Sequence, residues 1–175
     1  MGRYFNKEQI SLSGNTFAKA EKMAGRYFRI TPGEWEKRRY DVKTLAFLEK
    51  DEVREGAFAH LCKYELQKEK DSKDERLHFY RICLQDNRIL DAVDRAHSFI
   101  RLSPLLLYIA AHELVHIIRF ERGEGNFDAT AQERSDEEEK VHRITRNLLK
   151  PVTDPDLNLV LDCFSNRYRI GDLVQ

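Results

Sequence analysis

The chain has 175 residues, of which 41% are hydrophobic, so it is long enough to form one domain with a substantial core. Its 30 lysines and arginines balance 30 aspartates and glutamates, and a net charge of zero gives no overall attraction to nucleic acid or an anionic membrane. No run of about 18 apolar residues predicts a membrane span, and the polar residues 1–9 lack the apolar core of a signal peptide. We therefore expect a cytoplasmic protein.

The first part of the chain, residues 1–70, is predicted to be helical. A first helix within residues 15–28 has apolar residues at helical spacing: Phe17, Ala20, Ala24 and Tyr27. Thr31-Pro32-Gly33-Glu34 has the form of a capping box with proline at the first helical position. The helix that follows it is expected to carry Trp35, Val42, Leu45 and Leu48. Asp51 can cap another helix, whose apolar stripe would be Val53, Ala57, Leu61 and Tyr64.

The middle of the chain is ambiguous between strand and helix. Residues 67–76 are almost wholly charged or polar and predict a linker or exposed loop. Residues 77–84 are rich in aromatic and branched side chains, and Asp86-Asn87 could form a tight turn before residues 88–93, which predicts a β-hairpin. A helical stripe is the alternative, formed by Leu90, Val93, His97 and Ile100.

A buried helix is predicted around residues 103–120. Ser103 can cap its N-terminus, Pro104 suits its first turn, and Gly123 and Gly125 supply a stop. Both faces of this segment are apolar, so the helix should lie in the core.

This helix contains the pattern H-E-x-x-H. His112 and His116 are four residues apart and lie on one helix face, with Glu113 just off it. Two imidazoles can hold a metal, and the carboxylate can take the proton of a metal-bound water, which is the chemistry of zinc hydrolases. We therefore predict Zn²⁺ as the cofactor. The alternative is that both histidines are hydrogen-bonded to neighbours in an ordinary core.

A hydrolytic zinc site needs a third protein ligand and an open position for water. No histidine stands near Arg122, which excludes the extended metzincin motif. The next predicted helix runs to Leu149, before Pro151, and carries the candidates Glu133, Glu137, Glu138 and Glu139.

Helical geometry sorts these glutamates. The inward face is defined by Val141, Ile144, Thr145 and Leu148. Glu137 and Glu138 flank this face and Glu139 points away, so either of the first two can be the ligand. His142 is four residues after Glu138 and could hold that ligand or stabilise an oxyanion. The alternative is a solvated acidic face with a capping box from Ser135 to Glu138.

The two segments together resemble the ImmA/IrrE-type zinc peptidases, which are small intracellular gluzincin-like enzymes that often act on a repressor protein. The matching residues are His112, Glu113 and His116, then Glu138 and the run from Leu148 to Pro151. The resemblance spans about 40 residues. It implies that His112, His116 and Glu138 bind the metal and that Glu113 is the catalytic base.

Three other interpretations are open. E-x-x-H occurs at Glu75–His78, Glu113–His116 and Glu139–His142, and paired motifs of this kind build di-iron or di-manganese sites in helical bundles. Alternatively, the metal only stabilises the fold of a protein that binds a partner, although such a site has no need of Glu113. The basic residues around Tyr40 could contact nucleic acid, but their acidic neighbours favour a solvated helix face.

The three cysteines, Cys62, Cys83 and Cys163, are odd in number, far apart in the sequence and not arranged in CxxC pairs. This pattern argues against a disulfide framework and against a thiolate zinc site, so we expect free thiols.

We expect one α+β, predominantly helical, zincin-like domain with a small β-hairpin or sheet beside the motif helix, and an all-α bundle as the alternative. Zinc peptidases often have such a sheet, and this analogy favours the hairpin. Residues 71–175 would form the metal-binding part, packed with residues 1–70 and ending in a short helix near Leu157–Phe164. The expected activity is hydrolysis of a peptide or protein substrate, with Glu113 as the base and His142 or Tyr168 stabilising the oxyanion.

Overall fold

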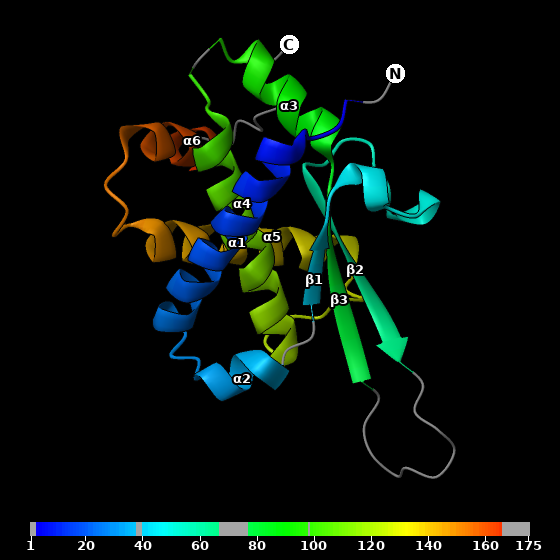
Figure 1. Cartoon of the computed structure of the whole chain (residues 1–175). Coiled ribbons are helices and arrows are strands. Elements are labelled where there is room, and N and C mark those ends of the chain that lie inside the picture. Colours follow the sequence, from blue (N-terminus) through cyan, green and yellow to red (C-terminus); the bar gives the residue numbers. More distant parts are fainter. Residues whose placement is uncertain (1–2, 38–39, 67–76, 98, 166–175) are drawn as a thin grey trace.

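The computed structural model describes residues 3–37, 40–66, 77–97 and 99–165 (Figure 1). Within these ranges the chain forms six α-helices, two 3₁₀ turns and a three-stranded mixed sheet, so the fold is α+β and predominantly helical, as expected. The elements in chain order are α1 (Lys7–Tyr27), α2 (Pro32–Lys37), β1 (Tyr40–Lys43), η1 (Leu45–Phe47), η2 (Lys50–Glu52), β2 (Ala59–Leu66), β3 (Leu77–Leu84), α3 (Asp86–Arg95), α4 (Leu102–Glu121), α5 (Ala131–Leu149) and α6 (Pro155–Ser165).

The sheet has the strand order β1-β3-β2, in which β1 is parallel and β2 antiparallel to β3. The central strand comes from the second part of the chain and both edge strands from the first, so the two parts share one sheet. Tyr80, Ile82 and Leu84 of β3 are buried in the core shared with the helices. Arg81 and Cys83 alternate with them and lie on the opposite face.

In the N-terminal part the first helix is longer than predicted and the second is shorter. α1 begins at Lys7, well before residue 15, because Asn6 and Gln9 form a capping box through two 2.9 Å hydrogen bonds. α2 begins at Pro32, as expected, and the Thr31 hydroxyl accepts from the backbone N–H of Glu34. This helix ends at Lys37 and does not reach Leu48.

The second half of that predicted helix and the next predicted helix are wrong. Residues 40–43 form β1 and residues 59–66 form β2, and both pair with β3. Asp51 lies in the 3₁₀ turn η2 and caps no α-helix. Tyr40, expected on a basic helix face, lies in β1, and its hydroxyl donates a hydrogen bond to Glu21 of α1. Pairing with β3 decides the conformation of both segments.

Residues 77–100 contain a strand followed by a helix, so the predicted hairpin is wrong in its second half. Residues 77–84 form β3, as expected, but residues 86–95 form α3. The Asp86 carboxylate does not close a tight turn. It accepts hydrogen bonds from the backbone N–H groups of Phe5 (2.8 Å) and Leu45 (3.0 Å), which are distant in the sequence. The predicted loop at residues 67–76 lies outside the described residues.

The predicted C-terminal helices are all present as α4, α5 and α6. α4 begins at Leu102, so Ser103 lies inside its first turn and does not cap it. α5 has its capping box at Thr130 and Glu133, and the alternative box at Ser135 is wrong. Gly123 adopts a φ of 70° just after α4, as its role in ending the helix requires.

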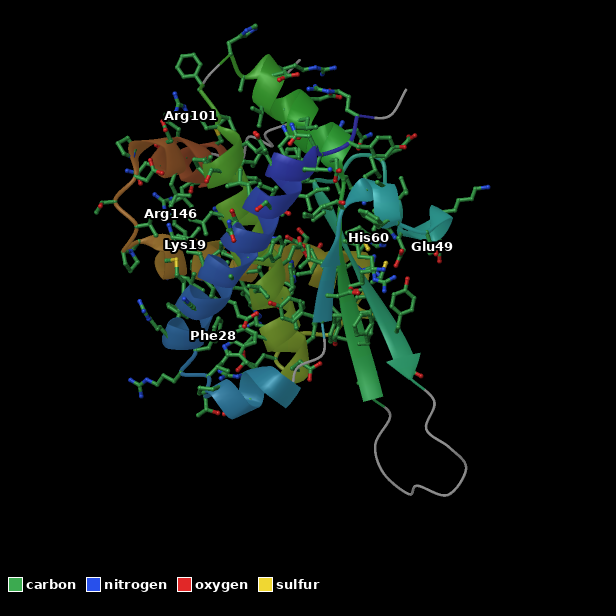
Figure 2. The ribbon with its side chains drawn as sticks, viewed as in Figure 1. Lys19, Phe28, Glu49, His60, Arg101 and Arg146 are labelled. Atoms are coloured by element: carbon green, nitrogen blue, oxygen red, sulfur yellow. The ribbon has the colours of Figure 1, made fainter. Side chains whose placement is uncertain are left out.

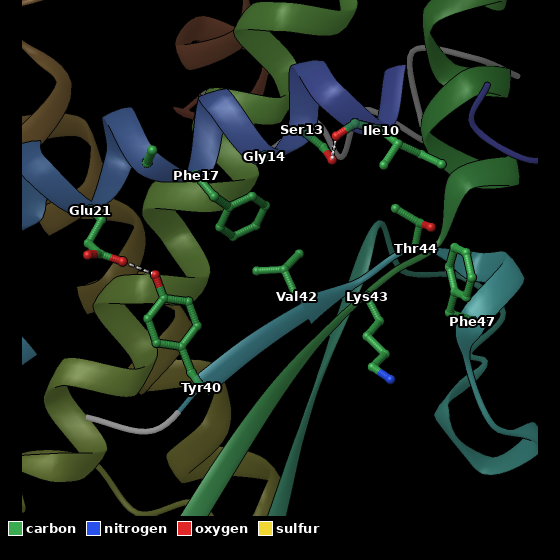
Figure 3. Close-up of a pocket in the computed structure, with 11 residues that line it drawn as sticks. Ile10, Ser13, Gly14, Phe17, Glu21, Tyr40, Val42, Lys43, Thr44 and Phe47 are labelled. Carbon is green, nitrogen blue, oxygen red and sulfur yellow. Dashed lines mark hydrogen bonds between the residues drawn. The ribbon is translucent and has the colours of Figure 1, made fainter. Parts of the chain in front are cut away.

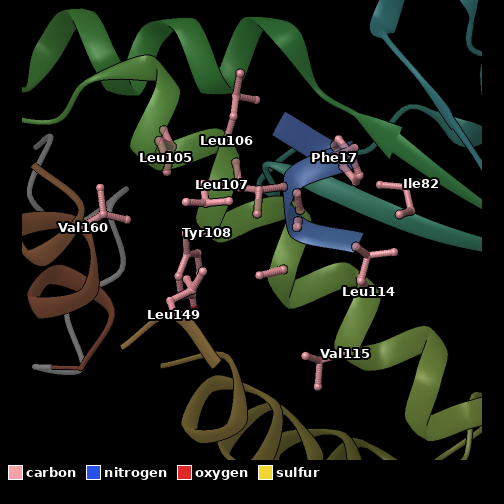
Figure 4. Packing of buried hydrophobic residues seen from close by; sticks show 14 of the residues in the cluster. Phe17, Ile82, Leu105, Leu106, Leu107, Tyr108, Leu114, Val115, Leu149 and Val160 are labelled. Carbon is pink, nitrogen blue, oxygen red and sulfur yellow. The ribbon is translucent and has the colours of Figure 1, made fainter. Parts of the chain in front are cut away.

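α4 is the central element of the core. Its residues from Pro104 to Ala111 are all buried, and α1, α5 and α6 pack against it (Figures 1 and 4). Its length and hydropathy would also suit a membrane span, but 72% of that stretch is buried inside the protein, as in the core helix of a globular domain.

Candidate metal centre

α4 presents two imidazoles on one side, because His112 and His116 are separated by about one helical turn. His112 is half-buried and His116 is buried. Their ring centroids lie 4.9 Å apart, and the His116 ring stacks on Phe120 one turn later. The two rings therefore form one compact donor pair.

Glu138 of α5 lies between the two rings. Its Oε2 is 3.0 Å from Nε2 of His112, and its Oε1 is 2.9 Å from Nε2 of His116. The three ligand atoms lie within 4.8 Å of one another. Two imidazole nitrogens and one carboxylate form a His₂Glu donor set, which zinc takes in hydrolytic sites, so the residues present fit that metal.

Glu137, the other candidate ligand, has a different role. Its carboxylate forms a two-pronged ion pair with Arg119 of α4, with Oε1 2.6 Å from Nε and Oε2 3.1 Å from Nη2. A Cβ atom at Gly125 would lie 2.8 Å from Oε1 of Glu137, so the glycine leaves room for this pair. The pair joins α4 to α5 one residue before Glu138 and helps to set the direction of that side chain.

The contacts between the imidazoles and Glu138 shift the ionisation of the cluster. Burial would raise the pKa of Glu138, but the hydrogen bonds from His112 and His116 outweigh it and hold that pKa well below its usual value. Burial would lower the pKa of His116, but the hydrogen bond to Glu138 and the nearby carboxylate of Glu113 raise the pKa above its usual value. The site therefore favours positive charge between its ligands, carried by protons or by a cation.

Glu113 follows His112 on α4 and is half-buried. Burial raises the pKa of Glu113, and the positive charge of His112 and His116 opposes this effect only in part. A carboxylate with a raised pKa is a better proton acceptor near neutral pH. The position and ionisation of Glu113 therefore suit a general base.

A chain of hydrogen bonds lies behind His112. Ser165 donates its only hydroxyl proton to the Leu161 carbonyl (2.7 Å), so Ser165 must accept from Nε2 of His142 (3.4 Å). Nδ1 of neutral His142 then accepts from the Tyr108 hydroxyl (2.6 Å). The Tyr108 oxygen is left to accept from Nδ1 of His112 (3.4 Å). This direction puts a proton on Nδ1 of His112 and leaves its Nε2 to face Glu138.

Burial of His142 supports this direction, because it lowers the pKa of His142 and favours the neutral ring. Tyr108 is almost fully buried and stacks on Phe164 of α6, with ring centroids 3.9 Å apart. Both nitrogens of His142 thus have protein partners. In this arrangement His142 uses its two ring nitrogens for Tyr108 and Ser165.

Other residues considered from the sequence lie elsewhere. Glu139 is exposed, and Glu133 belongs to the capping box of α5. Tyr168 and Glu75 lie outside the described residues. Tyr108 and Arg119 were not among the residues predicted from the sequence, although the helical spacing of Tyr108 to His112 was a usable signal.

A cavity of about 610 Å³ lies between α1 and β1 (Figure 3). Phe17 and Val42 face each other across it, and the hydrogen bond between Tyr40 and Glu21 lies at one end. No residue of the candidate metal centre lines this cavity. The cavity and the metal centre are separate features.

No family model, no curated protein and no solved structure matches the chain.

Proposed function

We propose that this chain is a zinc-dependent metallopeptidase of the zincin type that hydrolyses peptide bonds in a peptide or protein substrate. The observation that carries the proposal is the convergence of Nε2 of His112 and Nε2 of His116 on the two oxygens of Glu138, at 3.0 and 2.9 Å. Glu113 is adjacent on the same helix, and a structural metal site has no need of it. The resemblance to the ImmA/IrrE-type peptidases favours the same assignment.

In this proposal His112, His116 and Glu138 hold the metal, and Glu113 transfers the proton. When bound, zinc acts as a Lewis acid that makes a water molecule acidic near neutral pH and polarises the substrate carbonyl. Glu113 accepts the proton of the attacking water, and its raised pKa lets it hold that proton until the leaving nitrogen takes it.

His142 acts in this proposal as a positioning residue. The sequence suggested stabilisation of an oxyanion, but its Nδ1 accepts from Tyr108 and its Nε2 donates to Ser165. Through Tyr108 it fixes the proton of His112 on Nδ1, which keeps Nε2 free for the metal.

The test of the catalytic role is Glu113→Gln. We expect cleavage of a complex peptide mixture, followed by mass spectrometry, to fall by at least about 100-fold, because general-base catalysis contributes roughly 10²–10⁴-fold. Zinc content should stay at the level of the unmodified protein. Glu121→Gln, an exposed change on the same helix, is the matched control. Full activity of Glu113→Gln would refute the mechanism, and a zinc-loaded protein that cleaves nothing would refute the peptidase function.

The test of the ligand set is a matched pair of neighbouring substitutions. Glu138→Gln should remove one zinc equivalent per chain, because it removes the carboxylate between the imidazoles. Glu137→Gln should retain zinc, since Glu137 contacts Arg119 and not the histidines. Loss of zinc from Glu137→Gln alone would contradict the assignment of Glu138.

A further inference from the structure

A second group of metal-ligating side chains lies on the sheet face opposite the helices. In the register of β2 and β3, Cys62 is opposite Arg81 and Cys83 is opposite His60, so the two cysteines are diagonal neighbours on one face of the sheet, the face of His60, which Figure 2 labels. Glu52 of η2 is fully buried beside them. One carboxylate oxygen and the two sulfurs lie within 4.8 Å of one another.

The distance between the two sulfurs matches that of thiolates sharing a metal ion. Sγ of Cys62 and Sγ of Cys83 are 3.9 Å apart. Two thiolates at about 2.3 Å from a tetrahedral zinc ion would be separated by about 3.8 Å. The Cα atoms of diagonal neighbours in an antiparallel sheet lie about 7 Å apart, which is at the upper limit for a disulfide. The placement therefore suits a shared cation better than a covalent bridge.

Glu52 is held firmly in place. Its Oε1 accepts from the backbone N–H of Glu49 (2.8 Å), and its Oε2 accepts from the Tyr64 hydroxyl (2.5 Å) and from Nη1 of Arg81 (3.1 Å). A carboxylate has about four lone-pair positions, so three bonds leave one acceptor position on Oε1. The buried carboxylate therefore keeps capacity for one further donor or cation.

The charge around the cysteines also favours a cation. Arg81 is shared between two carboxylates, since its Nε and Nη2 contact Asp41 at 3.0 and 3.2 Å while its Nη1 contacts Glu52. One guanidinium and two carboxylates leave a net negative charge before either thiol loses its proton. Burial raises the pKa of Cys62 and of Cys83, so without a cation both thiols are neutral and poorly suited as nucleophiles.

The wide separation of the cysteines in the sequence argued against a thiolate site, but the pairing of β2 with β3 brings Cys62 and Cys83 together. We propose that Cys62, Cys83 and Glu52 form a second metal site, which takes a thiophilic divalent cation of the zinc class. Binding replaces the two thiol protons, which pass to solvent, with one metal ion held by two thiolates and a carboxylate. Three protein ligands leave one position for water. The site shares no residue with the centre formed by His112, His116 and Glu138. It therefore does not depend on whether the protein is a peptidase.

The test is titration of the full chain with cadmium, which gives ultraviolet sulfur-to-metal charge-transfer absorption when thiolates bind it. The protein carries Glu138→Gln, to disable the first centre, and is kept reduced by a non-thiol reductant. We expect one cadmium per chain, a thiolate absorption band, and the release of two protons per ion. Cys62→Ser and Cys83→Ser should each remove the band, whereas Cys163→Ser, the matched control, should retain it.

Two results would overturn the site. The first is the absence of a thiolate band and of proton release in the folded Glu138→Gln parent, a measurement that needs no cysteine variant to fold. The second is a band that survives Cys62→Ser and disappears with Cys163→Ser. Neither result bears on hydrolysis, so failure of this site and failure of the peptidase proposal can be told apart.

Discussion

At the scale of single residues, the Tyr108 hydroxyl is the link between His112 and the rest of the protein. It lies 2.6 Å from Nδ1 of His142 and 3.4 Å from Nδ1 of His112. Histidines that bind metal usually donate their other N–H to a fixed acceptor, which sets the tautomer and the orientation of the ring. Within the described residues His116 has no such acceptor on Nδ1, and stacking on Phe120 holds its ring instead.

Tyr108→Phe should therefore weaken zinc binding without unfolding the protein. The phenylalanine ring keeps the stacking on Phe164, and only the hydroxyl link is lost. We expect zinc affinity, measured by competition with a chelator, to fall by about 10–100-fold. Tyr40→Phe is the matched control, because it removes a hydroxyl bonded to Glu21 beside the cavity between α1 and β1. Equal zinc affinities in the two variants would exclude the positioning role of Tyr108.

The sequence pattern was sufficient to find the residues of the candidate metal centre but not to choose between two adjacent glutamates. Both flank the inward face of α5, and helical geometry gives them equal access. The choice depends on Arg119, whose ion pair holds Glu137 and leaves Glu138 beside the histidines. That ion pair is a contact between two helices, so no spacing within either helix could reveal it.

At the scale of elements, helical spacing misled the prediction for the segment after Asp51. Val53, Ala57, Leu61 and Tyr64 fit one helical stripe, but only Leu61 and Tyr64 lie in a regular element, the strand β2. Pairing with β3 decides in favour of β2. α4 and α5, of 20 and 19 residues, were predictable because a helical pattern of that length is longer than a typical strand.

Tyr80 joins the sheet to the end of α4, and its burial has a measurable consequence at high pH. Its ring packs against Phe120 and Phe127, both with centroids 6.3 Å away. Burial, with the negative charges of Glu121 and Asp128, raises the pKa of Tyr80 from 10.0 to about 12. The folded state therefore holds this proton more tightly than the unfolded chain. The resulting stability is complete below pH 10 and is lost as the pH rises through 12.

Tyr80→Phe should reduce this alkaline loss of stability, because phenylalanine keeps the ring and has no proton to lose. Two pKa units correspond to about 2.7 kcal/mol, so the unmodified protein should lose up to about that much more unfolding free energy than the variant. Urea unfolding at about pH 8 and about pH 12 measures the difference. Tyr27→Phe, at an exposed position, is the control and should behave like the unmodified protein. A parallel decline in Tyr80→Phe and unmodified protein would contradict the role given to Tyr80.

At the scale of the whole molecule, the candidate metal centre lies where the two longest helices of the C-terminal half meet. α4 supplies His112 and His116, and α5 supplies Glu138. α6 supports the site from behind through Phe164 and Ser165, while α1 covers another side of α4. A metal ion bound there would connect α4 to α5 in the folded state only, because the unfolded chain does not hold the three ligands together.

Zinc should therefore raise the thermal stability of the protein. At a free zinc concentration about 100 times the dissociation constant, binding adds about 2.7 kcal/mol. For a domain of this size, that corresponds to a rise in Tm of roughly 5–10 °C. Thermal unfolding followed by circular dichroism, with zinc and then with a chelator, measures the shift. The Cys62→Ser, Cys83→Ser double variant restricts the measurement to the histidine centre, and adding Glu138→Gln to it should abolish the shift. If zinc raised the Tm equally with and without Glu138, the ion would not be connecting α4 to α5.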